Sequence, residues 1–461
     1  MNKYLFFIPL LLAACHTWQD PLGSDDMLQK TLADVPHTIP AVCPDPDWSA
    51  LTFSQSIAAG LCKHPETRAA YADMESRSAA WGSAQSAYLP TLSATYRREH
   101  TRSAVSYADD AHSQNPGRFL AEMQWVLFDF GERAANRAQN AHLLRLAGAA
   151  YDRQLQTRWA AIAREYIRSD IARRKLAIAA DYNDVTAQIL DTVQTLHRAG
   201  VAIGADVQEA RLETQRAKLQ WLQNEQEHRN AQAALAESMG YAVDTVMQLE
   251  PLDDRHFDRQ HDDNIKALLT QMLRAHPTMA EAQARADAAK AAMDANRHAG
   301  SPQIFLYGTA ALNHHLQTRG MRYRENDQVV GVGIRWPLFE GYRRHYRTQE
   351  LQAQYDKEQA ALEALKSRLS LDVWQAYQQW QTAQAQRDVA RQGVQSAEEN
   401  VQTRLGRYRA GVGELRDVLH AQRSLHELRL AEADALQARH EAGLQLLFSL
   451  GQSRAQDAAE K

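Results

Sequence analysis

The 461-residue chain repeats its own landmarks at a nearly constant interval. The dipeptide His64-Pro65 returns 212 residues later as His276-Pro277. Further pairs recur at intervals of 210 to 212 residues: Pro90 and Pro302, Phe128 and Phe339, Gly131 and Gly341, Gly200 and Gly411, and Gly240 and Gly451. Such a fixed interval is typical of a duplicated structural unit. The sequence therefore predicts two homologous repeats, residues 51–240 and 265–451, joined by a linker over residues 241–264.

Each repeat contains a long stretch without proline. Gly131 and Gly200 are 69 residues apart, and Gly341 and Gly411 are 70 apart. At a rise of about 1.5 Å per residue, a helix of this length spans on the order of 100 Å. Apolar residues recur at helical spacing between Gln, Arg and Glu, for example Leu362, Leu365, Leu369, Val373, Tyr377 and Trp380. Such a narrow apolar stripe predicts long helices that pack side by side as in coiled coils.

A glycine turn followed by an acidic residue ends each long stretch. Gly200 precedes Asp206, and Gly411 precedes Asp417, with a further helical stretch after each. Each repeat is therefore predicted to be a helical hairpin with its tip turn at Gly200 or Gly411. Since Asp is common at helix N-caps, an alternative role for Asp417 is to cap the helix that follows.

Each repeat also has one non-helical interruption that alternates with period two. The predicted strands lie near residues 91–98 and 117–127 in the first repeat and near 303–311 and 328–338 in the second, with polar loops over 99–117 and 312–327. One apolar face and one small or polar face fit the wall of a transmembrane barrel. A soluble sheet with one face on a core alternates in the same way.

Four strands cannot close a barrel, because single-chain barrels begin at about eight strands. An open sheet edge is not tolerated in lipid. A membrane location therefore requires several copies of the chain, and three copies would supply 12 strands. The predicted fold class is mostly α with a β-barrel portion.

The N-terminus resembles a bacterial lipoprotein signal. Lys3 precedes an apolar run, and Leu12-Ala-Ala-Cys15 follows it, which predicts a signal peptide over residues 1–14 and acylation of Cys15. An ordinary secretory signal is the alternative. Residues 15–50 hold five prolines and predict an extended tether, and residues 452–461 form a polar tail. The remaining cysteines, Cys43 and Cys62, are a possible disulfide in an oxidising compartment.

Composition and motifs argue against nucleic-acid binding and catalysis. The net charge of −4 gives no basic surface for nucleic acid. The pairs His426-Glu427 and His440-Glu441 lack a second histidine at zinc-binding spacing. The pair His314-His315 is more simply a solvated loop pair than a metal site. We therefore expect no enzyme activity, no cofactor and no metal.

Three motifs carry a family resemblance: Trp125-Val-Leu-Phe-Asp-Phe-Gly131, Trp336-Pro-Leu-Phe-Glu-Gly341, and the turn from Tyr408 through Gly411 to Asp417-Val-Leu-His-Ala-Gln422. With the duplication, they resemble the TolC-type outer-membrane factor family, particularly its NodT-like lipoprotein branch, over nearly all of residues 51–451. The resemblance implies a homotrimer that forms a 12-stranded barrel in the outer membrane and a 12-helix tunnel in the periplasm. It also implies two partners, a periplasmic adaptor and an inner-membrane pump. The pump would be of resistance-nodulation-division type if the channel serves drug efflux. The alternative is the exit duct of a type I protein secretion system.

The same resemblance implies a gate at the hairpin tips. The second hairpin would lie innermost, so that Asp417 of three chains rings the pore, with Tyr408, Gly411 and His420 around it. Asp206 and Glu209 of the first hairpin would lie nearby or further out. Tyr408 matches a tyrosine that tethers the inner hairpin. Some members carry a basic residue where this chain has Gly413, and Arg409 or Arg416 could substitute.

Two other protein classes remain as alternatives. A periplasmic coiled-coil adaptor lipoprotein would share the long hairpins but normally adds a compact all-β domain, for which the sequence gives no signal. A lipid-anchored enzyme would need a catalytic constellation. The sequence therefore favours a passive exit duct.

Overall fold

A computed structural model describes residues 22–33, 45–105, 108–114, 117–254, 265–318 and 321–451, together with residues 20, 35, 43, 256 and 257. For residues 101–105, 108–114, 314–318 and 321–325 only the backbone is described. The signal peptide, the acylation candidate Cys15, the side chains of His314 and His315, and the tail 452–461 lie outside the described part. Two compact units make up the chain: Met1–Asp34, Asp73–Gly148 and Ala282–Leu362 in one, and Val35–Ala72, Ala149–Glu281 and Glu363–Lys461 in the other.

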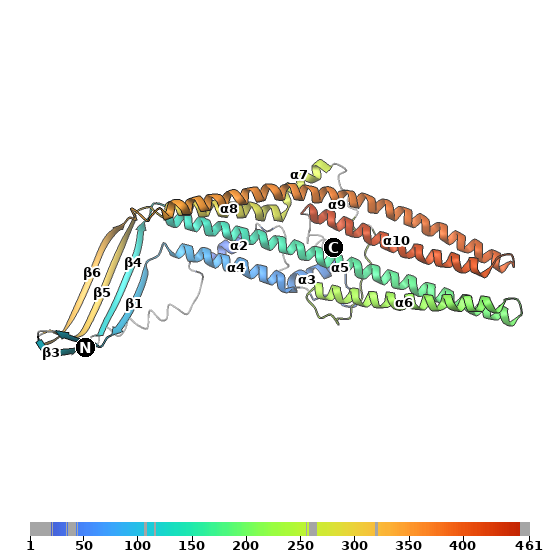
Figure 1. The fold of residues 1–461 in the computed structure, drawn as a ribbon, viewed down its shortest axis with the longest axis horizontal. Helices are drawn as coiled ribbons and strands as arrows, with labels where there is room; N and C mark the ends of the chain where they lie inside the picture. Colours follow the sequence, from blue (N-terminus) through green and yellow to red (C-terminus); the bar gives the residue numbers. More distant parts are fainter. Residues whose placement is uncertain are drawn as a thin grey trace. The chain divides into compact units, whose positions relative to one another are not determined.

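Apart from two additional strands in the first repeat, β2 and β3, both repeats run through the same order of elements (Figure 1). An N-terminal helix, α2 (Ser24–Ala33), precedes them. The first repeat contains α3 (Phe53–Lys63), α4 (Pro65–Ser86), β1 (Thr91–Arg98), β2 (Thr101–Val105), β3 (Ala108–Gln114), β4 (Gly117–Phe128), α5 (Glu132–Arg198) and α6 (Gly204–Ser238). The second contains α7 (Ile265–Ala275), α8 (Pro277–His298), β5 (Gln303–Thr318), β6 (Met321–Arg335), α9 (Arg343–Arg409) and α10 (Leu415–Ser449). Within the described residues, no helix has the length and hydropathy needed to span a membrane.

The first unit is organised by a four-stranded antiparallel sheet of order β1-β4-β5-β6 (Figure 1). The two hairpins join through β4 and β5, where Ala121 pairs with Ala310. Large apolar side chains on β6 are exposed in the single chain, with Val330 at 79%, Val332 at 64% and Ile334 at 72%. Among the residues that the structure describes, the sheet therefore has two free edges, β1 and β6, and an uncovered apolar face.

The strand boundaries differ from the predicted ones where the sequence is polar. β5 continues to Thr318, and β6 begins at Met321 and ends at Arg335, so most of the predicted loop 312–327 is paired backbone and 336–338 is not strand. The predicted loop 99–117 holds a second hairpin, β2–β3. The prediction was wrong there because alternating hydrophobicity marks only strand segments with one apolar face, whereas backbone pairing needs no apolar side chain.

In the second unit, the recurring His-Pro dipeptides start α4 and α8. His64 Nδ1 accepts a hydrogen bond from the Glu66 backbone N–H, and His276 Nδ1 accepts one from Thr278, each at 3.2 Å. The proline after each histidine is the first helical residue, where its missing N–H costs nothing. Burial lowers the pKa of both imidazoles, which favours the unprotonated Nδ1 that the cap requires.

The tether prediction is wrong for residues 24–33, which form α2. Leu28 and Thr31 of this helix are buried. A Cβ built on Gly148 of α5 would lie 2.7 Å from Thr31 Cγ2, and Ser78 Oγ of α4 donates to the Ser24 carbonyl. α2 is thus stabilised by small residues far away in the sequence, and local periodicity did not indicate it.

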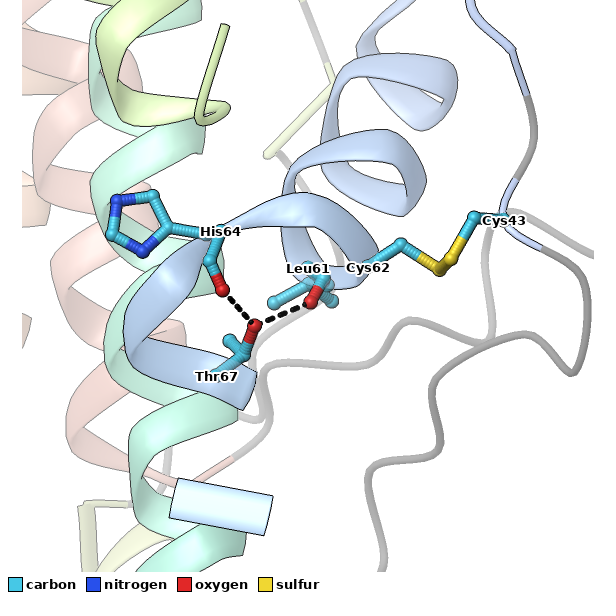
Figure 2. Close-up of a disulfide and its surroundings, with 5 residues drawn as sticks. All are labelled: Cys43, Leu61, Cys62, His64 and Thr67. Atoms are coloured by element: carbon cyan, nitrogen blue, oxygen red, sulfur yellow. Dashed lines mark hydrogen bonds between the residues drawn. A yellow bond between two sulfur atoms is a disulfide. The ribbon is translucent and has the colours of Figure 1, made fainter. Parts of the chain in front are cut away.

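Cys43 and Cys62 are joined by a disulfide with their Cα atoms 5.6 Å apart (Figure 2). Cys62 lies on the last turn of α3 and is 8% exposed. The next turn is held by Thr67, whose hydroxyl lies 2.8 Å from the Leu61 carbonyl and 2.7 Å from that of His64 (Figure 2). The disulfide therefore joins the N-terminal segment to a buried part of the first repeat.

Candidate gate at the hairpin tips

The two hairpin tips have the same backbone design. Gly200 and Gly411 have φ of +76° and +73°, and no atom lies within 4 Å of a Cβ built on either. Glycine is required for the left-handed backbone, not for space. The Val201 N–H donates to the Leu196 carbonyl at 2.9 Å, and the Val412 N–H to that of Arg407 at 3.1 Å. These bonds satisfy carbonyls at the ends of α5 and α9, so the chain reverses tightly into α6 and α10.

One apolar cluster joins the two tips of a single chain. It consists of Val193, Val207, Ala210, Leu415 and Leu419, which come from α5, α6 and α10. Tyr408 at the end of α9 packs against this cluster. Burial and, secondarily, the negative charge of Asp206 raise the pKa of Tyr408. The structure thus brings Tyr408 of the second hairpin near Asp206 of the first.

The duplicated aspartates have different partners. Each is the third residue of its helix. Asp206 accepts a hydrogen bond from the Ile203 backbone N–H at 3.3 Å. Asp417 instead accepts one from Arg404 Nη1 at 3.3 Å, and the N-cap of α10 is Glu414. The alternative role of Asp417 as the N-cap is therefore wrong.

A buried carboxylate, not predicted from the sequence, joins the hairpins further from the tips. Glu213 of α6 is 3% exposed and forms a bidentate ion pair with the Arg423 guanidinium of α10, in which each carboxylate oxygen accepts one N–H. The Tyr182 hydroxyl of α5 donates to the same carboxylate at 2.5 Å, and Arg216 Nη1 lies 3.3 Å away. Burial raises the pKa of Glu213, but the hydrogen bonds from Arg423 and Tyr182 and the charge of Arg423 outweigh it and hold the pKa below its ordinary value.

An unpaired histidine lies beside this carboxylate. The His426 imidazole stacks on the Tyr182 ring with centroids 4.2 Å apart and is 3% exposed. Within the described residues, neither ring nitrogen has a hydrogen-bond partner. Burial, together with the positive charge of Arg429, lowers its pKa. His426 is thus a neutral packing residue in this structure.

Comparison with known proteins decides the family. A family model described as outer membrane efflux protein matches residues 57–241 and 268–452, which are the two repeats. The chain belongs to the outer membrane efflux protein family. This membership makes it an outer-membrane exit duct.

Two curated relatives and a solved structure show the extent of the similarity. Protein CyaE of Bordetella pertussis is 28% identical over 82% of this chain and 80% of its own length. The pyoverdine export outer membrane protein OpmQ of Pseudomonas aeruginosa is 28% identical over 79% of this chain and 77% of its own. The outer membrane protein VceC of Vibrio cholerae has a TM-score of 0.71 at 18% identity, over 87% and 96% of the two chains. VceC thus shares the fold.

In this efflux protein, the close backbone around residue 413 favours a glycine there. A Cβ on Gly413 would lie 3.0 Å from the Tyr408 backbone nitrogen and 3.2 Å from the Arg407 carbonyl carbon. A basic side chain at this position would require the turn to move. Of the two predicted substitutes, Arg416 pairs with Glu414 at 3.1 Å and Arg409 is exposed. Arg404, which was not predicted, contacts Asp417.

The other predicted gate residues, Glu209 and His420, are exposed on α6 and α10. The structure of the single chain does not bring them into the tip cluster. One sequence signal could have indicated the buried pair: Glu213 and Arg423 are 210 residues apart, within one residue of the repeat interval. Opposite charges at matching levels of two repeats are candidates for a contact between them.

Proposed function

We propose that three copies of this efflux protein form a lipid-anchored channel that passes small molecules from an inner-membrane pump and a periplasmic adaptor to the outside. The observation that carries this proposal is the four-stranded sheet, with its free edges β1 and β6 and its uncovered apolar face. Lipid contains no water to satisfy free backbone groups, so each edge needs a neighbouring strand. Pairing β6 of one copy with β1 of the next closes a barrel of 12 strands in a trimer.

A curated relative supports the proposed cargo, and the family resemblance supports the proposed partners. Export of pyoverdine by OpmQ supports a small molecule as the cargo. The resemblance in the sequence supports a pump of resistance-nodulation-division type with its adaptor. Acylation of Cys15 would fix the chain to the inner face of the outer membrane, and a firm anchor requires more than one acyl chain.

A matched pair of charge substitutions tests the assembly. Val330→Asp places a charge on the exposed strand face, whereas Val246→Asp places one on the linker, where the side chain is 85% exposed. A lipid-facing charge near the bilayer midplane costs about 2–4 kcal/mol per chain for Arg or Lys, and a carboxylate costs somewhat less. We expect Val330→Asp to remove the trimer from outer-membrane fractions and Val246→Asp to leave it unchanged.

The readouts are native mass spectrometry of the purified protein and conductance in a planar bilayer. We expect a trimer that carries acyl chains on Cys15 and conducts ions. A monomer without conductance, or equal behaviour of the two variants, would contradict the proposal.

The gate is tested at Asp417. Carboxylates about 7 Å apart in water repel by about 0.6 kcal/mol per pair, which attracts cations without holding a pore shut. We expect Asp417→Ala to reduce the preference for cations in single-channel recordings. Arg404→Ala should increase it, because Asp417 then loses its positive neighbour at 3.3 Å. If both variants keep the wild-type reversal potential, the assignment of an Asp417 ring is wrong.

A further inference from the structure

Two segments outside the family-model matches pair with each other. They are residues 45–51 and residues 247–254 with His256 and Phe257, which we call the clasp, whereas the matches cover 57–241 and 268–452. The Gln248 N–H donates to the Trp48 carbonyl at 2.8 Å, the Leu51 N–H to the Gln248 carbonyl at 2.8 Å, and the Glu250 N–H to the Leu51 carbonyl at 3.0 Å. The clasp therefore lies outside the two matched repeats.

The first repeat holds the clasp at its centre. The Tyr166 hydroxyl of α5 lies 2.7 Å from the Glu250 carbonyl and 3.0 Å from the Leu51 carbonyl, so it bridges both strands of the clasp. Leu51 is fully buried. The Trp48 ring packs edge-on against Tyr241, with centroids 4.8 Å apart. Both segments are thus fixed to α5 and to the end of the first repeat.

The second repeat holds the other end of the clasp through Asp254. Its carboxylate lies 3.1 Å from Arg174 of α5 and 2.6 Å from Arg387 of α9. Its carbonyl accepts a hydrogen bond from Arg439 of α10 at 3.2 Å. Nearby, a Cβ on Gly443 of α10 would lie 2.8 Å from the Phe257 Cβ. The clasp therefore connects α5 of one repeat to α9 and α10 of the other.

The only covalent cross-link in the described part of the chain lies at the start of this clasp (Figure 2). Cys43 is exposed and comes two residues before the clasp, and Cys62 is on α3. With the bond formed, residues 45–51 are held at both ends, by α3 through the disulfide and by direct continuity into α3. Without it, the segment is held by three backbone hydrogen bonds, the Tyr166 contact and its packing.

We propose that Cys43 and Cys62 are an oxidative maturation site that locks the clasp across the two repeats. This inference rests on the proposed function, because a channel that meets a periplasmic adaptor has its helices in the oxidising periplasm. The oxidant is a thiol–disulfide oxidoreductase or a small-molecule disulfide. One cysteine thiolate attacks the disulfide of the oxidant and forms a mixed disulfide. The second cysteine thiolate then attacks the first cysteine's sulfur and displaces the oxidant as a thiolate. The cysteine pair loses two electrons and two protons, and the oxidant leaves as a dithiol or as two thiols.

The test is hydrogen–deuterium exchange of the full-length protein purified in detergent, with and without a phosphine reductant. We expect the amides of Leu51, Gln248 and Glu250 to exchange at least about tenfold faster after reduction, because local opening then needs less free energy. The tip amides of Val201 and Val412 should keep their rates. A Cys43→Ser, Cys62→Ser double variant should exchange fast at the clasp and be insensitive to the reductant.

Two results would overturn the inference: clasp amides whose rates do not change on reduction, or a protein isolated from cells with both thiols open to maleimide. Asp254→Asn tests the far end separately and should speed exchange at the linker amides without reductant. Conductance is measured on the same samples. A conducting trimer with an unaffected clasp refutes only this inference, whereas a reducible clasp in a protein that never conducts refutes only the proposed duct.

Discussion

Replacement of Arg423 by glutamine is expected to lower the free energy of unfolding by about 2–3 kcal/mol per chain, because it leaves a buried carboxylate without its main counter-charge. Glu213 is 3% exposed, and Arg423 contacts both of its oxygens. Tyr182 and Arg216 remain as partners, and Arg423 itself is 41% exposed, which keeps the loss below that of a fully buried pair. Chemical denaturation of the purified protein measures it.

Arg216→Gln is the matched control, since Arg216 contacts the same carboxylate at 3.3 Å but is 53% exposed. We expect a loss below about 0.5 kcal/mol there, as for exposed ion pairs. Because Arg423 and Glu213 lie on different hairpins, Arg423→Gln should also raise the open probability of single channels, and Arg216→Gln should not. Equal effects of the two variants would show that the buried pair does not hold the hairpins together.

Acidification from pH 7 to pH 4 is expected to destabilise the fold through buried histidines, of which His440 has the largest effect. His440 is 2% exposed, and burial lowers its pKa from 6.5 to about 4. The folded pKa lies below the unfolded one, so the unfolded chain binds the extra proton first. Stability is full above pH 6.5, falls as the pH drops below it, and levels off near pH 4. The shift corresponds to a loss of about 3 kcal/mol per chain.

The measurement is the midpoint of urea unfolding as a function of pH. His440→Phe should flatten the curve between pH 6.5 and 4, because phenylalanine keeps the packing against Phe257 without a titrating group. His420→Phe, at an exposed site of the same helix, should leave the slope unchanged. His64, His276 and His426, whose pKa values are also lowered, should leave a residual slope of the same sign. An identical slope in the two variants would contradict the assignment to His440.

Much of the fold was predictable because the types of neighbouring residues largely determine the local backbone conformation. The constant interval between the glycines indicated the duplication. Gly200 and Gly411 need a left-handed φ that other residues rarely adopt, so the tips could be placed to the residue. The proline-free stretches predicted α5 and α9, which span 67 residues each. Alternating apolar residues located all four strands of the main sheet, although for β5 and β6 only over their apolar portions.

The sequence by itself thus determined the two repeats, their hairpin tips and the family to which they belong. Only the tertiary structure decided which groups meet: Arg404 with Asp417, Arg423 with Glu213, and Asp254 with Arg174 and Arg387. It also decided that α2 is a helix. The physical reason is that periodicity and turn residues act within a few positions along the chain. The partner of a charged group, or the space beside a glycine, depends instead on the alignment of segments that can be more than 200 residues apart.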